Sequence, residues 1–247
     1  MCGNKKNQEE QLKERVILAL DVDSLDEAKK YILKLKGEVK LFKIGIRLFF
    51  SCGPQIIDVV REKDGEVFLD AKFHDIPSVV EAAVRIAGKK GVKMITVHTL
   101  GGVEMMRRAK KALQEENPEA KVLGVTLLTS LDQRALEEEL GIKEELGRKV
   151  LFLASMARKA GLDGVVCSGW EVENLRSFFG RDFLLVVPGI RMESLKEDEQ
   201  KRVLTPGEAI LKGATHIVVG RPVLQASDPV LEVKKIFENI KEKIWQN

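Results

Sequence analysis

The chain is poor in cysteine and in aromatic residues, and it has no long hydrophobic run. Its three cysteines, Cys2, Cys52 and Cys167, are scattered and form no CxxC pair, so neither a disulfide framework nor a zinc site is indicated. Aromatic residues make up 5% of the 247 positions, which argues against a stacking platform for single-stranded nucleic acid. No apolar run approaches the roughly 18 residues of a membrane span. We therefore expect a protein with reduced cysteines that neither crosses a membrane nor binds single strands.

A strong excess of charge of either sign is also missing. The formal net charge is +3 and no long basic block occurs, so a nucleic-acid partner is not indicated. A small anionic ligand stays possible, because a few well-placed cations are enough to bind one. Residues 1–15 are polar and lack the apolar segment of a secretory signal. We expect a cytoplasmic protein.

Short apolar runs alternate with longer amphipathic stretches along the chain. The apolar runs predict eight strands, over residues 16–20, 41–46, 66–70, 94–98, 122–128, 164–167, 184–187 and 216–219. The amphipathic stretches predict helices over residues 24–37, 54–62, 78–87, 103–115, 133–139, 144–159 and 230–244. This alternation is typical of an α/β fold in which a parallel sheet closes into a (β/α)8 TIM barrel. An open doubly wound sheet is the alternative, but no G-x-G-x-x-G follows the first strand. We predict a polar extension at 1–14 and a single barrel domain over 15–247.

Three charged residues lie at and just after the end of the third predicted strand, in the sequence DAKFHDIP. Asp70 and Lys72 are two positions apart, so on a regular strand both side chains point to the same face. Asp75 follows in the next loop. A lysine between two carboxylates stays charged even when it is partly buried. The pattern predicts an ammonium group prepared for a reacting atom.

Other polar residues occur where further predicted strands end, which is the edge where the active site of such a barrel lies. They are Asp21, Lys43, His98, Thr126, Thr129, Arg191 and Arg221. Each also has an ordinary structural explanation, such as a turn cap, a surface charge or a structural ion pair. We interpret His74, His98 and His216 as structural. The joint clustering of the others is what indicates a catalytic site.

Two segments after the seventh and eighth strands indicate a phosphate site. They are PGIR, from Pro188 to Arg191, and VGRP, which includes Gly220 and Arg221. Loops at these two places often bind phosphate in (β/α)8 barrels. Glycine lets backbone N–H groups approach an anion, and arginine adds a bidentate contact. A helix starting at about Pro222 would direct its positive end to the same anion.

These residues together resemble orotidine 5′-phosphate decarboxylase over nearly the whole chain. The match runs from the segment LALD, ending at Asp21, to the VGRP segment. The pattern Asp70-x-Lys72-x-x-Asp75-Ile76-Pro77 is highly specific to that superfamily, and its form with His74 resembles the bacterial branch. The segments LTS, at 128–130, and QKR, at 200–202, also match in order.

The resemblance implies a role for each charged residue. Lys72 is the proton donor, and Asp70 sits beside the departing carboxylate. Lys43 pairs with Asp70 and touches the ribose, while Asp21 holds a ribose hydroxyl. Asp75 reaches across a homodimer interface to flank the partner's lysine. The reaction it implies is loss of CO2 from orotidine 5′-monophosphate to give UMP in de novo pyrimidine biosynthesis.

The resemblance also implies the remaining substrate contacts. Thr129, or its neighbour Ser130, contacts the pyrimidine edge, and Gln200 bridges the pyrimidine and the phosphate. The other substrate-binding residues are Ile76, Pro188, Arg191, Gly220 and Arg221. Members of this family need no metal or organic cofactor, and we expect none here. The alternatives are metal-dependent sugar-phosphate enzymes of the same superfamily, which use Mg²⁺ at the acidic residues, and a phosphate-ligand sensor without catalysis.

Overall fold

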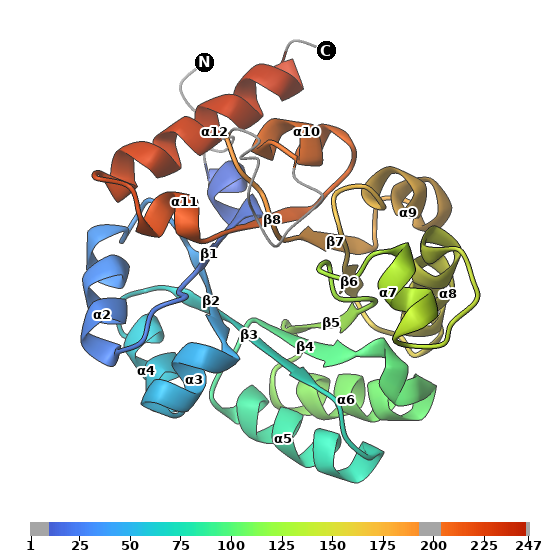
Figure 1. Ribbon diagram of the computed structural model, residues 1–247. Helices are drawn as coiled ribbons and strands as arrows, with labels where there is room; N and C mark the ends of the chain where they lie inside the picture. Colours follow the sequence, from blue (N-terminus) through green and yellow to red (C-terminus); the bar gives the residue numbers. More distant parts are fainter. Residues whose placement is uncertain (1–9, 193–203, 246–247) are drawn as a thin grey trace.

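Eight parallel strands form one closed ring, with β1 hydrogen-bonded to both β2 and β8 (Figure 1). The structure, a computed structural model, describes residues 10–192 and 204–245. The strands are β1 (Val16–Ala19), β2 (Leu41–Gly45), β3 (Glu66–Phe73), β4 (Met94–His98), β5 (Lys121–Val125), β6 (Gly164–Val166), β7 (Leu184–Val187) and β8 (His216–Val219). The predicted (β/α)8 barrel and its eight strands are confirmed.

Helices surround the ring (Figure 1). They are α2 (Leu25–Lys34), α3 (Ile46–Cys52), α4 (Gln55–Arg61), α5 (Pro77–Lys89), α6 (Gly102–Glu116), α7 (Gln133–Glu138), α8 (Leu146–Lys159), α9 (Val172–Phe179), α10 (Pro206–Leu211), α11 (Arg221–Leu224) and α12 (Pro229–Trp245), with a 3-10 turn η1 (Thr99–Gly101). The Ser24 side chain accepts a hydrogen bond from the Glu27 amide at 3.2 Å, so the predicted start of α2 is confirmed. Helices α3, α9 and α10 were not predicted.

Two apolar layers hold the barrel. The larger lies between the strands and the surrounding helices, where alternate strand residues meet the apolar faces of the helices. The smaller fills the inside of the ring and consists of Ile17, Ala19, Leu41, Phe68, Met94, Leu123, Val186 and Val218. Because the interior is packed with side chains, the barrel is a core and not a pore.

The amino ends of the strands carry a separate polar network. Lys110 on α6 contacts Asp163 at 2.6 Å, and the same carboxylate oxygen accepts a hydrogen bond from the Val122 amide at 2.8 Å. His216 begins β8 at this end. Residues 10–15 are helical and Leu12 belongs to the main core, so part of the predicted extension packs on the barrel. The boundary at residue 14 stays a prediction.

Two of the three cysteines lie in the described part of the chain. Cys52 and Cys167 are buried and free, and Cys2 lies outside the described residues. Within residues 10–192 and 204–245, no helix has both the length and the apolar character to cross a membrane.

Candidate active site

A pocket of about 260 Å³ opens at the carboxyl ends of the strands. Its floor includes Phe68 and Val218 of the inner apolar layer. The predicted site residues that line it are Asp21, Lys43, Asp70, Lys72, Thr129, Pro188, Arg191, Gly220 and Arg221. Residues from seven of the eight strands or the loops after them therefore meet in one place, as the fold predicts.

Four of these side chains form a row of alternating charge. Lys43 Nζ lies 3.3 Å from Asp21 Oδ1 and 3.5 Å from Asp70 Oδ2, and Lys72 Nζ lies 2.9 Å from Asp70 Oδ1. The side chains of Lys43 and Asp70 are each 12% exposed, whereas Lys72 is 38% exposed. The row thus leads from a solvent-accessible carboxylate, through two buried groups, to an ammonium that a ligand can reach.

Glycine makes room for this row. Gly45 pairs with Asp70 across β2 and β3, and a Cβ atom there would lie 3.1 Å from Lys43 Nζ. Gly220 similarly faces Asp21, whose Oδ2 would lie 3.3 Å from an added Cβ. Both glycines keep the space beside these ion pairs free of side chains.

Asp70 is held as a carboxylate by its neighbours. Burial alone raises the pKa of Asp70, but the charges of Lys43 and Lys72, with hydrogen bonds from Lys72 and Thr96, outweigh burial. The net pKa lies below the ordinary aspartate value. A fixed negative charge therefore stands beside the Lys72 ammonium.

Lys72 leaves regular strand geometry, which corrects one step of the sequence argument. Its φ is 49°, in the left-handed region that residues other than glycine rarely occupy. The β3–β4 register shifts between Leu69, opposite Ile95, and Phe73, opposite Val97. Asp70 and Lys72 do converge, but through this bulge and not through simple alternation.

Thr96 was missed by the sequence analysis, and it touches both key groups. It lies fully buried in β4, accepts a hydrogen bond from the Lys72 amide at 2.9 Å and donates one to Asp70 Oδ1 at 3.0 Å. A threonine in a strand is common, so its type carried no signal. The bulge opposite it, had it been predicted, would have drawn attention to it.

The two predicted phosphate segments lie on the pocket wall. Gly189 has a φ of 78°, a conformation that favours glycine. Burial, and secondarily the nearby charge of Arg221, lowers the pKa of Arg191, so two guanidinium groups share one region. The predicted helix after Gly220 is the single turn α11, so its dipole adds little and the arginines carry the positive charge.

Three of the predicted residues that the structure describes, Asp75, Ile76 and Thr126, do not line this pocket. Asp75 is exposed, and its Oδ1 accepts a hydrogen bond from the Ile76 amide at 2.6 Å. Neither Asp75 nor Ile76 lines the pocket of its own protomer. Gln200 lies outside the described residues.

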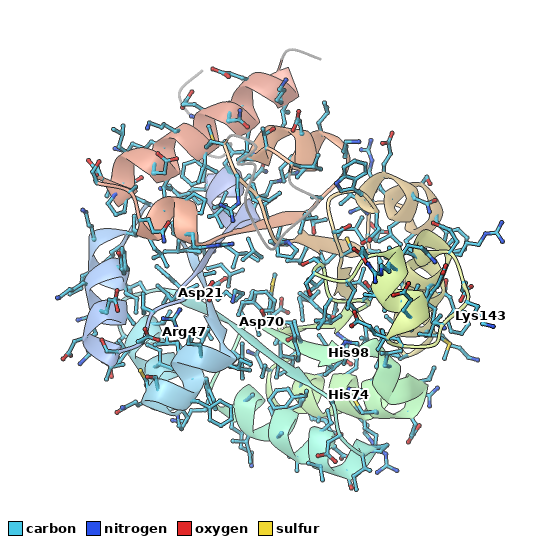
Figure 2. The ribbon with its side chains drawn as sticks, in the orientation of Figure 1. Asp21, Arg47, Asp70, His74, His98 and Lys143 are labelled. Carbon is cyan, nitrogen blue, oxygen red and sulfur yellow. The ribbon has the colours of Figure 1, made fainter. Side chains whose placement is uncertain are left out.

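His74 and His98 form a neighbouring pair. Figure 2 shows Asp21 and Asp70 over the barrel opening, with His74 and His98 farther out. The two imidazole rings stack with centroids 5.2 Å apart. Burial, followed by the charges of His74 and Lys72, lowers the pKa of His98. In the described part of the chain, no group of three or more His, Cys, Asp or Glu side chains is arranged to hold a metal ion.

Comparison with known proteins gives relatives along almost the full chain. A relative from Trichlorobacter lovleyi, named orotidine 5′-phosphate decarboxylase, is 42% identical over 94% of this chain and 97% of its own. A relative of the same name from Syntrophomonas wolfei is 43% identical over 94% of this chain and 100% of its own.

Solved structures agree with the sequence relatives. The crystal structure of orotidine 5′-phosphate decarboxylase from Lactobacillus acidophilus has a TM-score of 0.82 and 37% identity, covering 91% of this chain and 98% of its own. The sequence profile described as "Orotidine 5'-phosphate decarboxylase / HUMPS family" matches residues 14–236. Profile, relatives and fold coincide on the barrel that carries the charged row, and the chain belongs to the orotidine 5′-phosphate decarboxylase / HUMPS family.

Proposed function

We propose that this protein decarboxylates orotidine 5′-monophosphate to UMP and CO2 in pyrimidine biosynthesis, with Lys72 as the proton donor. The observation that carries the proposal is the row Asp21, Lys43, Asp70 and Lys72 at the pocket floor. The names of the relatives and of the solved structure support the substrate.

The reaction replaces a carboxylate on C6 of the pyrimidine by hydrogen. The bond from C6 to the carboxylate carbon breaks, CO2 leaves, and the electron pair stays on C6. The Lys72 ammonium stabilises that negative charge and then transfers a proton to C6, after which the neutral amine regains a proton from water. Its contact with Asp70 at 2.9 Å holds the Lys72 side chain beside a carboxylate before the reaction begins.

The charged groups at Lys72 take the place of the electron sink into which other decarboxylases delocalise the negative charge. Asp70 is an ionised, mostly buried carboxylate, so a substrate carboxylate beside it meets a like charge that disappears as CO2 departs. Lys43 between Asp21 and Asp70 keeps the row rigid and reaches the ribose with Asp21. No cofactor is assigned a step in this mechanism.

Contacts to parts of the substrate far from C6 also contribute to the rate acceleration. We assign the phosphate to Arg191, Arg221 and the Gly220 backbone, and the pyrimidine edge to Thr129, all of which line the pocket with Pro188. Gln200 is assigned to the bridge between pyrimidine and phosphate. Interactions with a non-reacting phosphate can be used to hold the reacting end in place.

A homodimer completes the proposed site. Asp75 and Ile76, which do not line the pocket of their own protomer, are assigned to the partner's pocket. Support comes from exposed apolar side chains that follow the ends of the adjacent strands β2, β3 and β4, namely Ile46, Phe50, Ile76, Val79 and Leu100. Large apolar side chains gathered at one rim are typical of an interface.

The test is the loss of ultraviolet absorbance when purified protein meets orotidine 5′-monophosphate in buffer with EDTA. We expect turnover that EDTA does not change. Turnover only with Mg²⁺ on a 3-keto sugar phosphate would instead assign the chain to the metal-dependent branch. Tight binding of the nucleotide without turnover would indicate a sensor.

A further inference from the structure

The bulge in β3 is built against one residue of the neighbouring strand. On β3, Asp70, Ala71 and Lys72 lie between the paired positions Leu69 and Phe73, whereas on β4 only Thr96 lies between the matching positions. Thr96 is buried in a strand that is otherwise apolar up to His98. A buried hydroxyl needs partners, and here both come from the bulge.

The direction of these two hydrogen bonds is fixed by chemistry. The Lys72 amide can only donate, so Thr96 Oγ1 accepts at 2.9 Å. The single hydroxyl hydrogen then goes to Asp70 Oδ1 at 3.0 Å, the same oxygen that contacts Lys72 Nζ at 2.9 Å. One hydroxyl thereby ties the Lys72 backbone and the Lys72 side chain to a common carboxylate.

Lys72 needs such a tie, because its backbone is strained. A lysine at a φ of 49° is less stable than one in an extended conformation, and surrounding contacts must hold it. If the Lys72 backbone relaxed to a negative φ, the Lys72 side chain would move out of the charged row that Lys43 and Asp70 continue. The amide contact to Thr96 is a hydrogen bond that such a relaxation would break.

We propose that Thr96 is a positioning residue, which holds Lys72 in its left-handed conformation and orients Asp70 beside the ammonium. The inference rests on the proposed function, because its effect is read from decarboxylation. Thr96 does not line the pocket and is not a catalytic residue. It acts on the reacting carbon through Lys72 and Asp70.

The test compares Thr96→Val, which keeps shape and removes the hydroxyl, with Thr96→Ser, which keeps the hydroxyl. We expect Thr96→Val to lower kcat by about tenfold to a hundredfold, the effect of one hydrogen bond to a charged group, with little change in KM. Thr96→Ser should restore most of kcat. The acid limb of the kcat profile should move to higher pH in Thr96→Val, because Asp70 loses a hydrogen bond that favours its ionised form.

The control is Thr99→Val. Thr99 is also buried, and its hydroxyl donates to the Val125 carbonyl at 2.8 Å, away from the charged row. It should lose stability but keep kcat and its pH profile. If Thr96→Val does not fold, Thr96→Cys replaces it, because a thiol is only a weak hydrogen-bonding group. The kcat of Thr96→Cys should then be lower than that of Thr96→Ser.

The outcomes separate the two proposals. An inactive wild-type protein contradicts the proposed function. An active wild-type protein with unchanged kcat in folded Thr96→Val, or equal kcat in Thr96→Cys and Thr96→Ser, overturns the role of Thr96. A loss of kcat in Thr96→Val that Thr96→Ser does not restore also overturns it.

Discussion

At the scale of single residues, Lys72 is unusual in both its backbone and its side chain. Its φ is positive and its ammonium lies against a mostly buried carboxylate. Neither feature helps folding, since the first costs conformational energy and the second desolvates charge. Residues that break local rules in this way cluster at functional sites.

Replacing Lys72 by alanine should separate binding from chemistry. Phosphate and ribose contacts remain in Lys72→Ala, so UMP should still bind, whereas kcat should fall by about a thousandfold or more through loss of the proton donor. Calorimetry with UMP and the absorbance assay measure the two effects. A Lys72→Ala protein with substantial turnover would assign the proton to another group.

Replacing Arg221 by alanine should weaken the use of the phosphate. We expect kcat/KM on orotidine 5′-monophosphate to fall by about tenfold to a hundredfold, as for a lost charged hydrogen bond. On the nucleoside orotidine, which has no phosphate, the variant should equal the wild type. Arg134→Ala is the matched control, because Arg134 is 81% exposed and pairs only with Glu138 among the contacts described. Equal losses on both substrates would contradict the assignment.

His216 should make stability depend on pH. Burial, followed by the charge of Arg15, lowers its pKa from 6.5 to about 4, although Glu14 opposes this shift. The unfolded chain therefore binds more protons between these values, so the free energy of unfolding falls as pH drops from about 6.5 to 4. At pH 5 the loss should be about 2 kcal/mol relative to neutral pH.

Urea unfolding of wild type and His216→Gln from pH 4 to 9 measures this effect. The variant should show a smaller decrease below pH 6.5, and the two curves should run parallel from pH 7 to 9. Equal decreases in both proteins at acid pH would exclude His216 as the cause.

At the scale of helices and strands, apolar periodicity predicted all eight strands, because barrel strands are apolar on both faces. It did not predict α3, because this helix begins at Ile46, directly after Gly45, the last residue of β2. Nor did it predict the bulge in β3, since a register shift depends on the neighbouring strand and not on local sequence. Thr96 was missed for the same reason, whereas Asp70 and Lys72 were visible as charges at a strand end.

The contact between β6 and β7 should be intolerant of any side chain at Gly164. A Cβ there would lie 2.2 Å from the Leu184 carbonyl oxygen, so the two strands would have to move apart. We expect Gly164→Ala to lower the free energy of unfolding by about 1–3 kcal/mol, measured by urea titration.

Gly147→Ala is the control for this prediction. Gly147 lies in the first turn of α8, and the nearest atom to an added Cβ is Glu145 Oε1, at 3.0 Å, on a flexible side chain. Its stability should stay within about 0.5 kcal/mol of the wild type, or rise. A Gly164→Ala protein as stable as Gly147→Ala would show that the strands can adjust.

At the scale of the whole molecule, the protomer alone leaves the proposed site short of Asp75. The sequence motif named the residue, but only the fold shows that its carboxylate lies outside its own pocket. The expectation that Asp75 serves the partner comes from the resemblance to the family, because the spacing of residues in one chain does not indicate which subunit a side chain serves.

Mixing two inactive variants tests the shared site. A hybrid of Lys72→Ala with Asp75→Asn contains one site with Lys72 and the partner's Asp75 both intact, and one site lacking both. After random reassociation about half of the dimers are hybrids, so activity should return to about a quarter of wild type. Sedimentation of each variant checks that dimers form. No recovery among dimers that do exchange would contradict the shared carboxylate.

The Lys110–Asp163 pair at the amino ends of the strands has a consequence for how this protein can change. Between it and the charged row lies the inner apolar layer, and a strand of four residues spans about 13 Å. Substitutions that far apart, with no partner in common, usually have additive effects. The amino ends of the strands can therefore accumulate stabilising mutations during evolution or engineering. The carboxyl ends can meanwhile keep the strained Lys72 and the catalytic rate that depends on it.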